Sequence, residues 1–195
     1  MSVMYREPSI IKKSKDGRVA AVDMASELLN SRVLLLEGEV NDVTCNGLIK
    51  SMLVLEHQDA HEPITLIINS PGGSVTAGLA LIDTMQSLDC PVTTVGEGVV
   101  ASMAAVILAC GDRHTQVLIH QLMGGTGMAQ QTDIEIAAQH TATMRAELDE
   151  LLAERGNLSA REFHELTERD CWCNAKRALE LGLVDEVIAP SKKAL

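Results

Sequence analysis

The middle of the sequence alternates between segments typical of buried strands and segments typical of helices. "PITLIINS" (63–70) and "CPVTTVGEGVV" (90–100) are short and largely apolar, and each precedes a run with helical periodicity, over 74–88 and 102–110. Another strand is predicted over 115–120. Parallel strands are joined by crossover helices. The alternation therefore predicts an α/β fold, with the apolar strand 63–70 buried on both faces.

The flanking segments extend this pattern. A short helix is predicted from Asp23, and a longer one over 43–59 with Val43, Leu48, Met52 and Leu55 facing inward. The helix over 132–155 is predicted to be capped by Thr132 or Asp133 and to end at Gly156. Two further helices are predicted, one that begins with a capping box at Ser159 and one over 174–181. Strands are expected over 32–38 and 183–188. No repeat or linker divides residues 21–195, which predicts one domain. Residues 1–20 are polar and aperiodic, as in a flexible N-terminal arm.

Composition argues against several classes of partner. The 195 residues include 16 Lys and Arg against 27 Asp and Glu, a net charge of −11. An acidic chain without a basic stripe is poorly suited to nucleic acid or to an anionic membrane surface. The longest apolar run, Val99–Cys110, is shorter than the roughly 20 residues that cross a bilayer. Five cysteines without metal-ligand spacing indicate reduced thiols and a cytoplasmic location.

Three residues suggest a hydrolase that uses a serine nucleophile. Ser102 is predicted at a strand-to-helix junction, where a hydroxyl is exposed and a helix N-terminus adds positive potential. His120 ends the strand eighteen positions later, which is far enough for a short helix and a returning strand. Asp170 could orient the imidazole. Taken singly, these residues are more commonly a helix cap, a structural histidine and a surface charge.

The junction "NSPGGSV" (69–75) is a second candidate feature. Two glycines after a buried strand bring backbone N–H groups close to a ligand, because no Cβ intervenes. Such donors at a helix start suit an oxyanion or a phosphate. An ordinary strand-to-helix turn is the alternative interpretation. The N–H of Met103, just after Ser102, could face the same oxygen.

Together these segments resemble the Clp protease proteolytic subunit family, from about Val22 to Ile188. The resemblance rests on "RVLLLEGEV", "INSPGGSVTAGLALIDTMQ", "ASMAA", "LIHQ", "QTDIEI", "TERD" and "ALELGLVDEV". It implies a crotonase-like fold of stacked β-β-α units and a serine peptidase core. It also implies the site residues: Ser102 as nucleophile, His120 as base, Asp170 as orienting carboxylate, and the N–H groups of Gly73 and Met103 as oxyanion hole.

The resemblance also implies an assembly. The helix over 132–155 would be a protruding handle that joins two stacked heptameric rings, and Arg169 would couple handle contacts to the triad. Residues 8–20 would form loops at an axial pore. An AAA+ Clp ATPase would unfold polypeptides and feed them to the chamber. The ATPase consumes the ATP, so no cofactor is expected in this chain.

The chain also departs from the family pattern. The segment between Ser102 and His120 is shorter than usual, and Ala104 replaces a glycine. "HQL" replaces "HQP", and the usual aromatic residues of the ATPase-docking clefts are replaced by Thr65, Ile67 and Ser87. These departures indicate a divergent paralogue. They keep open an alternative function as a weakly active or inactive structural ring subunit that works in mixed assembly with another Clp proteolytic paralogue.

Two other enzyme classes share the implied fold. A crotonase-type acyl-CoA enzyme needs a CoA-binding surface and a placed glutamate, and no such pair is evident. A Ser–Lys membrane peptidase needs a lysine base, but the sequence has no lysine between Lys50 and Lys176.

Overall fold

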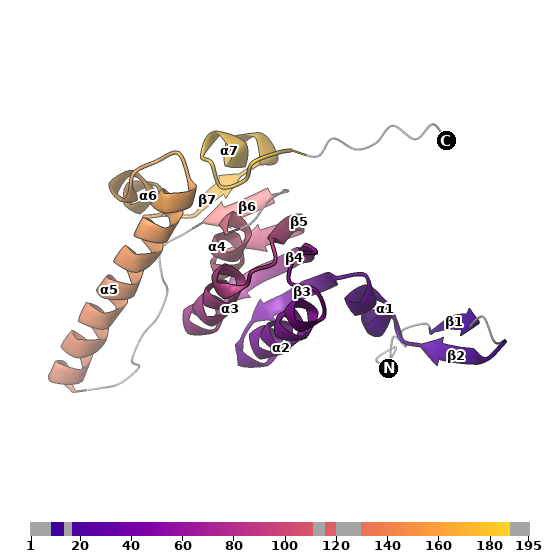
Figure 1. Cartoon of the computed structure of the whole chain (residues 1–195). Coiled ribbons are helices and arrows are strands. Elements are labelled where there is room, and N and C mark those ends of the chain that lie inside the picture. The colour runs from indigo at the N-terminus through magenta and orange to yellow at the C-terminus, as the bar shows by residue number, and fades with distance from the viewer. Residues whose placement is uncertain (1–8, 14–16, 111–115, 120–129, 188–195) are drawn as a thin grey trace, which may run out of the picture.

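The computed structural model describes residues 9–13, 17–110, 116–119 and 130–187. Its centre is a five-stranded sheet of order β3-β4-β5-β6-β7, in which the first four strands are parallel and β7 is antiparallel to β6 (Figure 1). The strands are β3 (Val33–Val40), β4 (Ile64–Gly73), β5 (Val92–Ala101), β6 (Gln116–Ile119) and β7 (Cys171–Cys173). The predicted α/β class is therefore confirmed.

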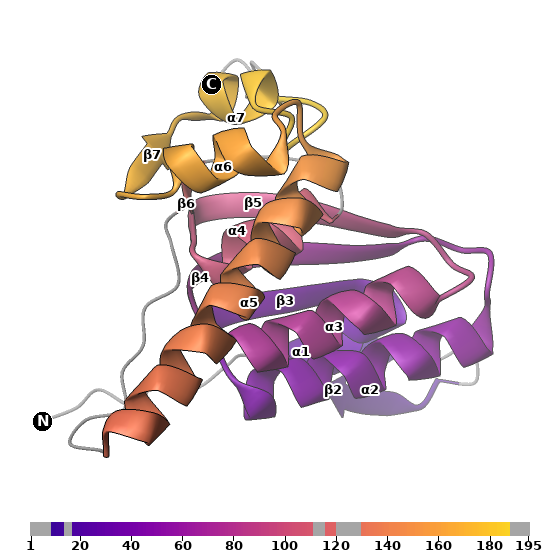
Figure 2. The same ribbon diagram turned by 90° about the vertical axis from the view of Figure 1, so that its left-hand side faces the viewer.

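Seven helices are described, and three of them cover one face of the sheet. They are α1 (Met24–Asn30), α2 (Asp42–Gln58), α3 (Val75–Ser87), α4 (Met103–Ala109), α5 (Gln131–Arg155), α6 (Ala160–Leu166) and α7 (Ala175–Glu180). Figure 2 shows α2 and α3 side by side in front of the sheet, with α4 beside α3 and behind α5. Buried aliphatic side chains of the sheet and these helices form the core, which Phe163 joins from α6.

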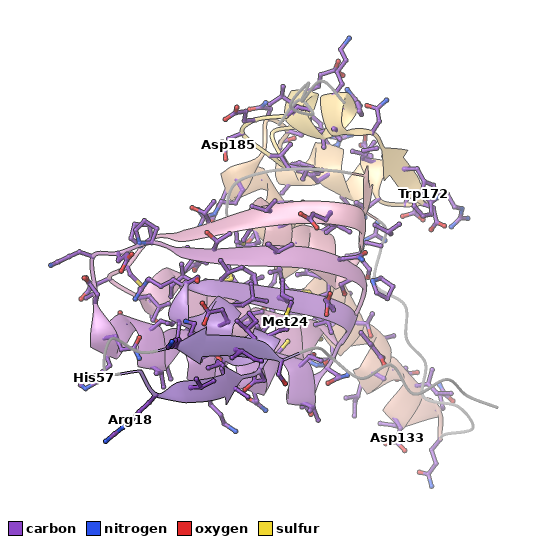
Figure 3. All side chains as sticks on the ribbon, turned by 90° about the vertical axis from the view of Figure 1, so that its right-hand side faces the viewer. Arg18, Met24, His57, Asp133, Trp172 and Asp185 are labelled. Atoms are coloured by element: carbon purple, nitrogen blue, oxygen red, sulfur yellow. The ribbon has the colours of Figure 1, made fainter. Side chains whose placement is uncertain are left out.

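The other face of the sheet differs from the sequence prediction. Alternate residues of β4, namely Ile64, Leu66 and Ile68, are fully buried, whereas Thr65 and Ile67 between them are only half-buried. Figure 3 shows this second face, where none of the described helices covers β4 and β5. The continuous apolar run of β4 therefore fills one face within this chain and leaves the other face partly open.

Both ends of the described chain also differ from expectation. Part of the arm predicted over 1–20 forms an antiparallel hairpin, β1 (Ile10–Lys13) with β2 (Val19–Val22). The predicted strand over 183–188 is wrong for residues 183–187, which form no strand. Gly182 ends α7 with φ 72°, and the N–H of Leu183 donates to Ala178 O at 3.0 Å. This is a Schellman arrangement, which uses Leu183 to close the helix.

Local signals explain most helix boundaries. The capping box at Ser159 is present, and Gly156 ends α5, as predicted. Asn41 begins α2 with a second capping box, and α5 begins at Gln131, ahead of the predicted caps. Val43 was predicted to face inward but is exposed, because Cys45 takes that place beside Leu48, Met52 and Leu55 on the buried face of α2.

Arg32 is a buried charged residue that holds the end of α2 to the start of β4. Its Nη1 donates to Leu55 O at 2.9 Å, its Nη2 to Asp59 O at 3.0 Å, and its Nε to Pro63 O at 3.2 Å. We expect Arg32→Met to lower the free energy of unfolding by about 3 kcal/mol, because buried carbonyls lose charged donors. Urea unfolding at a fixed protein concentration measures this loss.

Arg161→Met is the matched control for that measurement. Arg161 is exposed, and its Nε donates along its own helix to Glu165 Oε1 at 3.0 Å. An exposed pair of this kind contributes about 0.5 kcal/mol. Equal losses in the two variants would contradict a structural role for the buried guanidinium.

Candidate active site

Ser102 occupies the junction between β5 and α4 in an unusual backbone conformation. Its φ is 54° and its ψ is −128°, in a region that L residues rarely adopt. Ser102 stands at the N-cap position of α4, yet its side chain makes no capping hydrogen bond. Nucleophilic serines at strand-to-helix turns have strained backbones of this kind and hydroxyls free to react.

The other small polar N-caps among the described helices behave differently. Each accepts a hydrogen bond from a backbone N–H of its own helix, and they are Asp23, Asn41, Ser74, Ser159 and Asn174. Capping by such side chains contributes about 1 kcal/mol. Ser102 lacks this stabilising hydrogen bond and has a strained backbone conformation. The interpretation of Ser102 as an ordinary helix cap is therefore not supported.

The glycine turn at the end of β4 packs directly against Ser102. A Cβ built on Gly72 would lie 2.6 Å from Ser102 Cβ and 2.9 Å from Met103 N, closer than real side chains approach. Gly72 has φ 88°, and its N–H donates to Ser70 Oγ at 3.1 Å. The turn proposed from sequence to carry oxyanion donors is thus in contact with the serine junction.

Gly73 and Met103 carry the two backbone N–H groups that the resemblance implies for an oxyanion hole. Gly73 has φ 152° and lies so close to Val40 O that a Cβ would not fit. Met103 is the first residue of α4, where an N–H has no intrahelical acceptor. Its side chain is buried against Gly78 of α3, which fixes the start of α4.

Ala104, which stands in place of the family's glycine, follows Met103 beside this turn. Ala104 is fully buried and belongs to the aliphatic core. The methyl group is therefore accommodated inside the protein. The hydroxyl of Thr94 donates to Leu108 O at 2.9 Å and holds the other end of α4 to β5.

The sheet register brings the ends of three strands to one edge. Ala101 of β5 pairs with Leu118 of β6, and Ile119 of β6 pairs with Cys171 of β7. Ser102 follows β5, and Asp170 immediately precedes β7. His120 follows Ile119 but lies outside the described residues. Because neighbouring strands are about 4.8 Å apart, Ser102 after β5 and Asp170 before β7 lie at the same edge of the sheet as the end of β6.

Asp170 is exposed, and α5 holds the segment before it. Arg145 of α5 donates through Nη2 to Glu168 Oε2 at 3.0 Å and to His164 O at 3.0 Å. The hydrogen bond and charge of Arg145 lower the pKa of the Glu168 carboxyl. Arg169 is exposed and donates through Nη1 to Glu168 O at 3.1 Å.

The contacts between α5 and α6 were not predicted from the sequence. Asp149 is buried and lies 2.7 Å from His164 Nδ1, measured from its Oδ2. Asp149 and Leu152 are the buried residues of α5, a helix of 25 residues. The spacing of Arg145 and Asp149, one helical turn apart, indicated that they share a face of α5. It did not indicate that this face meets the segment leading to Asp170.

The described residues suit nucleophilic acyl transfer. Ser102 has a strained backbone and a side chain that makes no capping hydrogen bond, and it packs against the glycine turn next to the N–H of Met103. The carboxylate of Asp170 precedes β7, two strands along the sheet from β5. Among the described helices, none has the length and hydrophobicity needed to cross a bilayer.

Comparison with known proteins places these features in context. Residues 15–191 match the model of a family described as Clp protease. The chain is 40% identical over 192 residues to the ATP-dependent Clp protease proteolytic subunit of Lactococcus lactis subsp. lactis (strain IL1403), with 94% of this chain and 96% of that protein covered. It is also 40% identical over 190 residues to the protein of the same name from Streptococcus pneumoniae (strain 70585), covering 93% and 96%.

Proposed function

The chain belongs to the Clp protease family, and on that premise we propose that it is a serine endopeptidase subunit that cleaves unfolded polypeptides to short peptides. The observation that carries the proposal is the register of β5, β6 and β7, which brings Ser102 after β5 and Asp170 before β7 to the same sheet edge as the end of β6. His120 is the next residue in sequence after β6, so a base there would stand between the nucleophile and the carboxylate, in the order that a triad requires.

In this mechanism, Ser102 Oγ attacks the carbonyl carbon of a peptide bond while His120 accepts the hydroxyl proton. The carbonyl oxygen becomes an oxyanion that accepts hydrogen bonds from the N–H groups of Gly73 and Met103. His120 then gives the proton to the leaving amine, and an acyl-enzyme remains on Ser102. Water hydrolyses that ester by the same route, and Asp170 stabilises the imidazolium in both steps.

The proposed assembly is a crotonase-like subunit in two stacked heptameric rings, with α5 as the handle between rings. Two features support a partner for these surfaces. α5 extends away from the sheet, with Ile134 and Ile136 47% and 63% exposed (Figures 1 and 2). The uncovered face of β4 and β5 also presents half-buried apolar side chains. Burial of such surfaces in an oligomer is favourable.

Within that assembly, the β1–β2 hairpin would border the axial pore, and an AAA+ Clp ATPase would deliver substrates with its own ATP. Arg169 is proposed to couple handle contacts to Asp170, since it lies next to it in the segment that α5 holds through Arg145. The net charge of −11 argues against nucleic acid and membrane partners. Five free cysteines support a reducing, cytoplasmic compartment.

A fluorophosphonate probe tests the nucleophile directly. We expect the probe to modify Ser102 of the assembled protein, located by peptide mass spectrometry, because the probe reacts only with an activated serine hydroxyl. Ser102→Ala should abolish labelling. The control is Ser159→Ala, which removes a true cap from α6 and should retain labelling.

The mixed-ring alternative predicts a distinct outcome in a peptide turnover assay. Thr65, Ile67 and Ser87 in place of aromatic residues favour altered docking or a paralogue partner, because aromatic side chains supply much of an anchor pocket's burial. Peptide turnover that appears only after mixing with a Clp proteolytic paralogue would favour this alternative. Labelling of the Ser102→Ala variant would overturn the proposed nucleophile.

A further inference from the structure

Two cysteines lie together on β7, immediately after Asp170. The Sγ atoms of Cys171 and Cys173 are 3.6 Å apart. Alternate residues of a strand point to the same side, so both thiols lie on one side of β7 and Trp172 lies on the other. Trp172 is 62% exposed, and Figure 3 shows it at the outer surface. Neither thiol has a role in the proposed peptidase mechanism.

We propose that Cys171 and Cys173 form a dithiol site that a peroxide oxidises reversibly to a disulfide, and that formation of this bond displaces Asp170. The first part concerns these two thiols alone. The second part rests on the proposed function, because it needs Asp170 to serve the reaction. The oxidised protein would then be a folded peptidase whose orienting carboxylate is out of place.

The two thiols have different surroundings and would take different roles. Cys171 is half-buried, whereas Cys173 is 2% exposed. Burial, with the hydrogen bond to Cys171, raises the pKa of the Cys173 thiol to about 12. Thiolates are the species that react with oxidants. Cys171 is therefore the thiol that the peroxide meets first, and Cys173 resolves the product.

The chemistry balances with one peroxide per disulfide. Cys171 Sγ attacks a peroxide oxygen, the O–O bond breaks, and water leaves as the sulfenic acid forms. Cys173 Sγ then attacks the sulfenyl sulfur, the S–O bond breaks, and the released hydroxide takes the Cys173 proton to form a second water. Two thiols are oxidised by two electrons while the peroxide is reduced to two waters. A small thiol reductant reverses the bond.

Strand geometry explains why the bond would disturb the site. An S–S bond of about 2.05 Å requires the two sulfurs to approach from their present separation. Alternate Cα atoms of an extended strand are about 6.6 Å apart, near the upper end of the range that a disulfide spans. Closure to the most common Cα separation, about 5.5–6 Å, would shorten β7. Both cysteines pair with β6, Cys171 with Ile119 and Cys173 with Val117, so shortening disrupts the ladder next to Asp170.

Thiol counting tests the dithiol site. The full-length protein is treated with hydrogen peroxide, alkylated with iodoacetamide in denaturant, and digested with trypsin. The peptide Asp170–Lys176 contains both cysteines and none of the other three. We expect this peptide to lose two hydrogens and both alkyl groups on oxidation, and to regain both alkyl groups after dithiothreitol. Trp172, the single tryptophan of the chain, should show a matching reversible change in fluorescence.

Serine variants provide the controls. Cys171→Ser and Cys173→Ser should each abolish the two-hydrogen loss within this peptide. Cys110→Ser should retain it, because Cys110 is a thiol at the end of α4, outside the pair, and burial raises its pKa to about 11. Free thiols at Cys171 and Cys173 after peroxide treatment, or sulfinic acids without a linked form, would overturn the proposal.

Peptide turnover tests the displacement of Asp170. We expect oxidation to lower kcat about 100-fold and dithiothreitol to restore it, the loss that follows from misplacing a catalytic group by about 1 Å. After peroxide treatment, Cys171→Ser should turn over peptide as fast as it does before treatment. A disulfide that forms without a change in turnover would overturn the coupling. Absence of turnover in the reduced protein would count against the proposed function, while the thiol count would still decide the dithiol site.

Discussion

Gly72→Ala is expected to destabilise the protein by about 4 kcal/mol and to lower peptide turnover at least about 100-fold. The added Cβ would meet Ala101 O at 2.5 Å, Ser102 Cβ at 2.6 Å and Met103 N at 2.9 Å. These backbone and Cβ atoms cannot rotate away, so the serine junction itself must shift. The positive φ of 88° adds a further cost for an L residue. Chemical denaturation and a fluorogenic peptide assay measure the two effects.

Gly38→Ala separates the backbone cost from the steric cost. Gly38 has φ 75°, close to that of Gly72, but a Cβ there would meet nothing within 4 Å. We expect Gly38→Ala to cost about 1 kcal/mol and to leave turnover intact. If Gly72→Ala turns over peptide as fast as Gly38→Ala, then contact between the glycine turn and Ser102 has no bearing on the reaction.

Asp170→Asn is expected to lower kcat about 10,000-fold, with KM little changed. In the proposed mechanism, an amide at this position preserves shape but cannot stabilise the imidazolium that forms when His120 takes the serine proton. The fluorogenic peptide assay measures kcat, and the rate of fluorophosphonate labelling provides a second measurement, which should fall with it. The protein must be kept reduced throughout, so that Cys171 and Cys173 stay as thiols.

Asp83→Asn is the control for the loss of one carboxylate. Asp83 is exposed on α3, within the helical layer that covers the sheet, so its replacement changes net charge equally without touching the sheet edge. We expect turnover within a factor of about two of the parent, as for a surface substitution. Unchanged turnover in Asp170→Asn would assign the orienting role to another group.

Local sequence signals predicted most of the fold because they act over a few residues. The apolar run of β4, the capping box at Ser159 and the stop at Gly156 all predicted elements that the structure contains. The expected strand is wrong over 183–187 for the same reason, since the pattern "LVDEVI" carries no sign that Leu183 closes a helix. A buried pair of apolar residues can serve a helix end as well as a strand.

The candidate site could be predicted only in part. The position of Ser102 at a strand-to-helix junction followed from the pattern, but its φ of 54° depends on packing against Gly72, thirty residues earlier. The contact between Arg145 and Glu168 joins segments that no periodicity relates. The covered and uncovered faces of β4 could not be distinguished from the sequence either. An apolar run has the same pattern whether a helix of the same chain or a partner subunit covers it.

The short length of β7 affects how this protein would lose activity on heating or in denaturant. Three residues hold this strand to the sheet, and among the described strands it pairs with β6 alone, itself four residues long. Elements with so few ladder hydrogen bonds open with far less free energy than the global transition requires. Mild heat or denaturant would therefore detach the carboxylate while β3, β4 and β5 remain intact, and inactivation would precede melting.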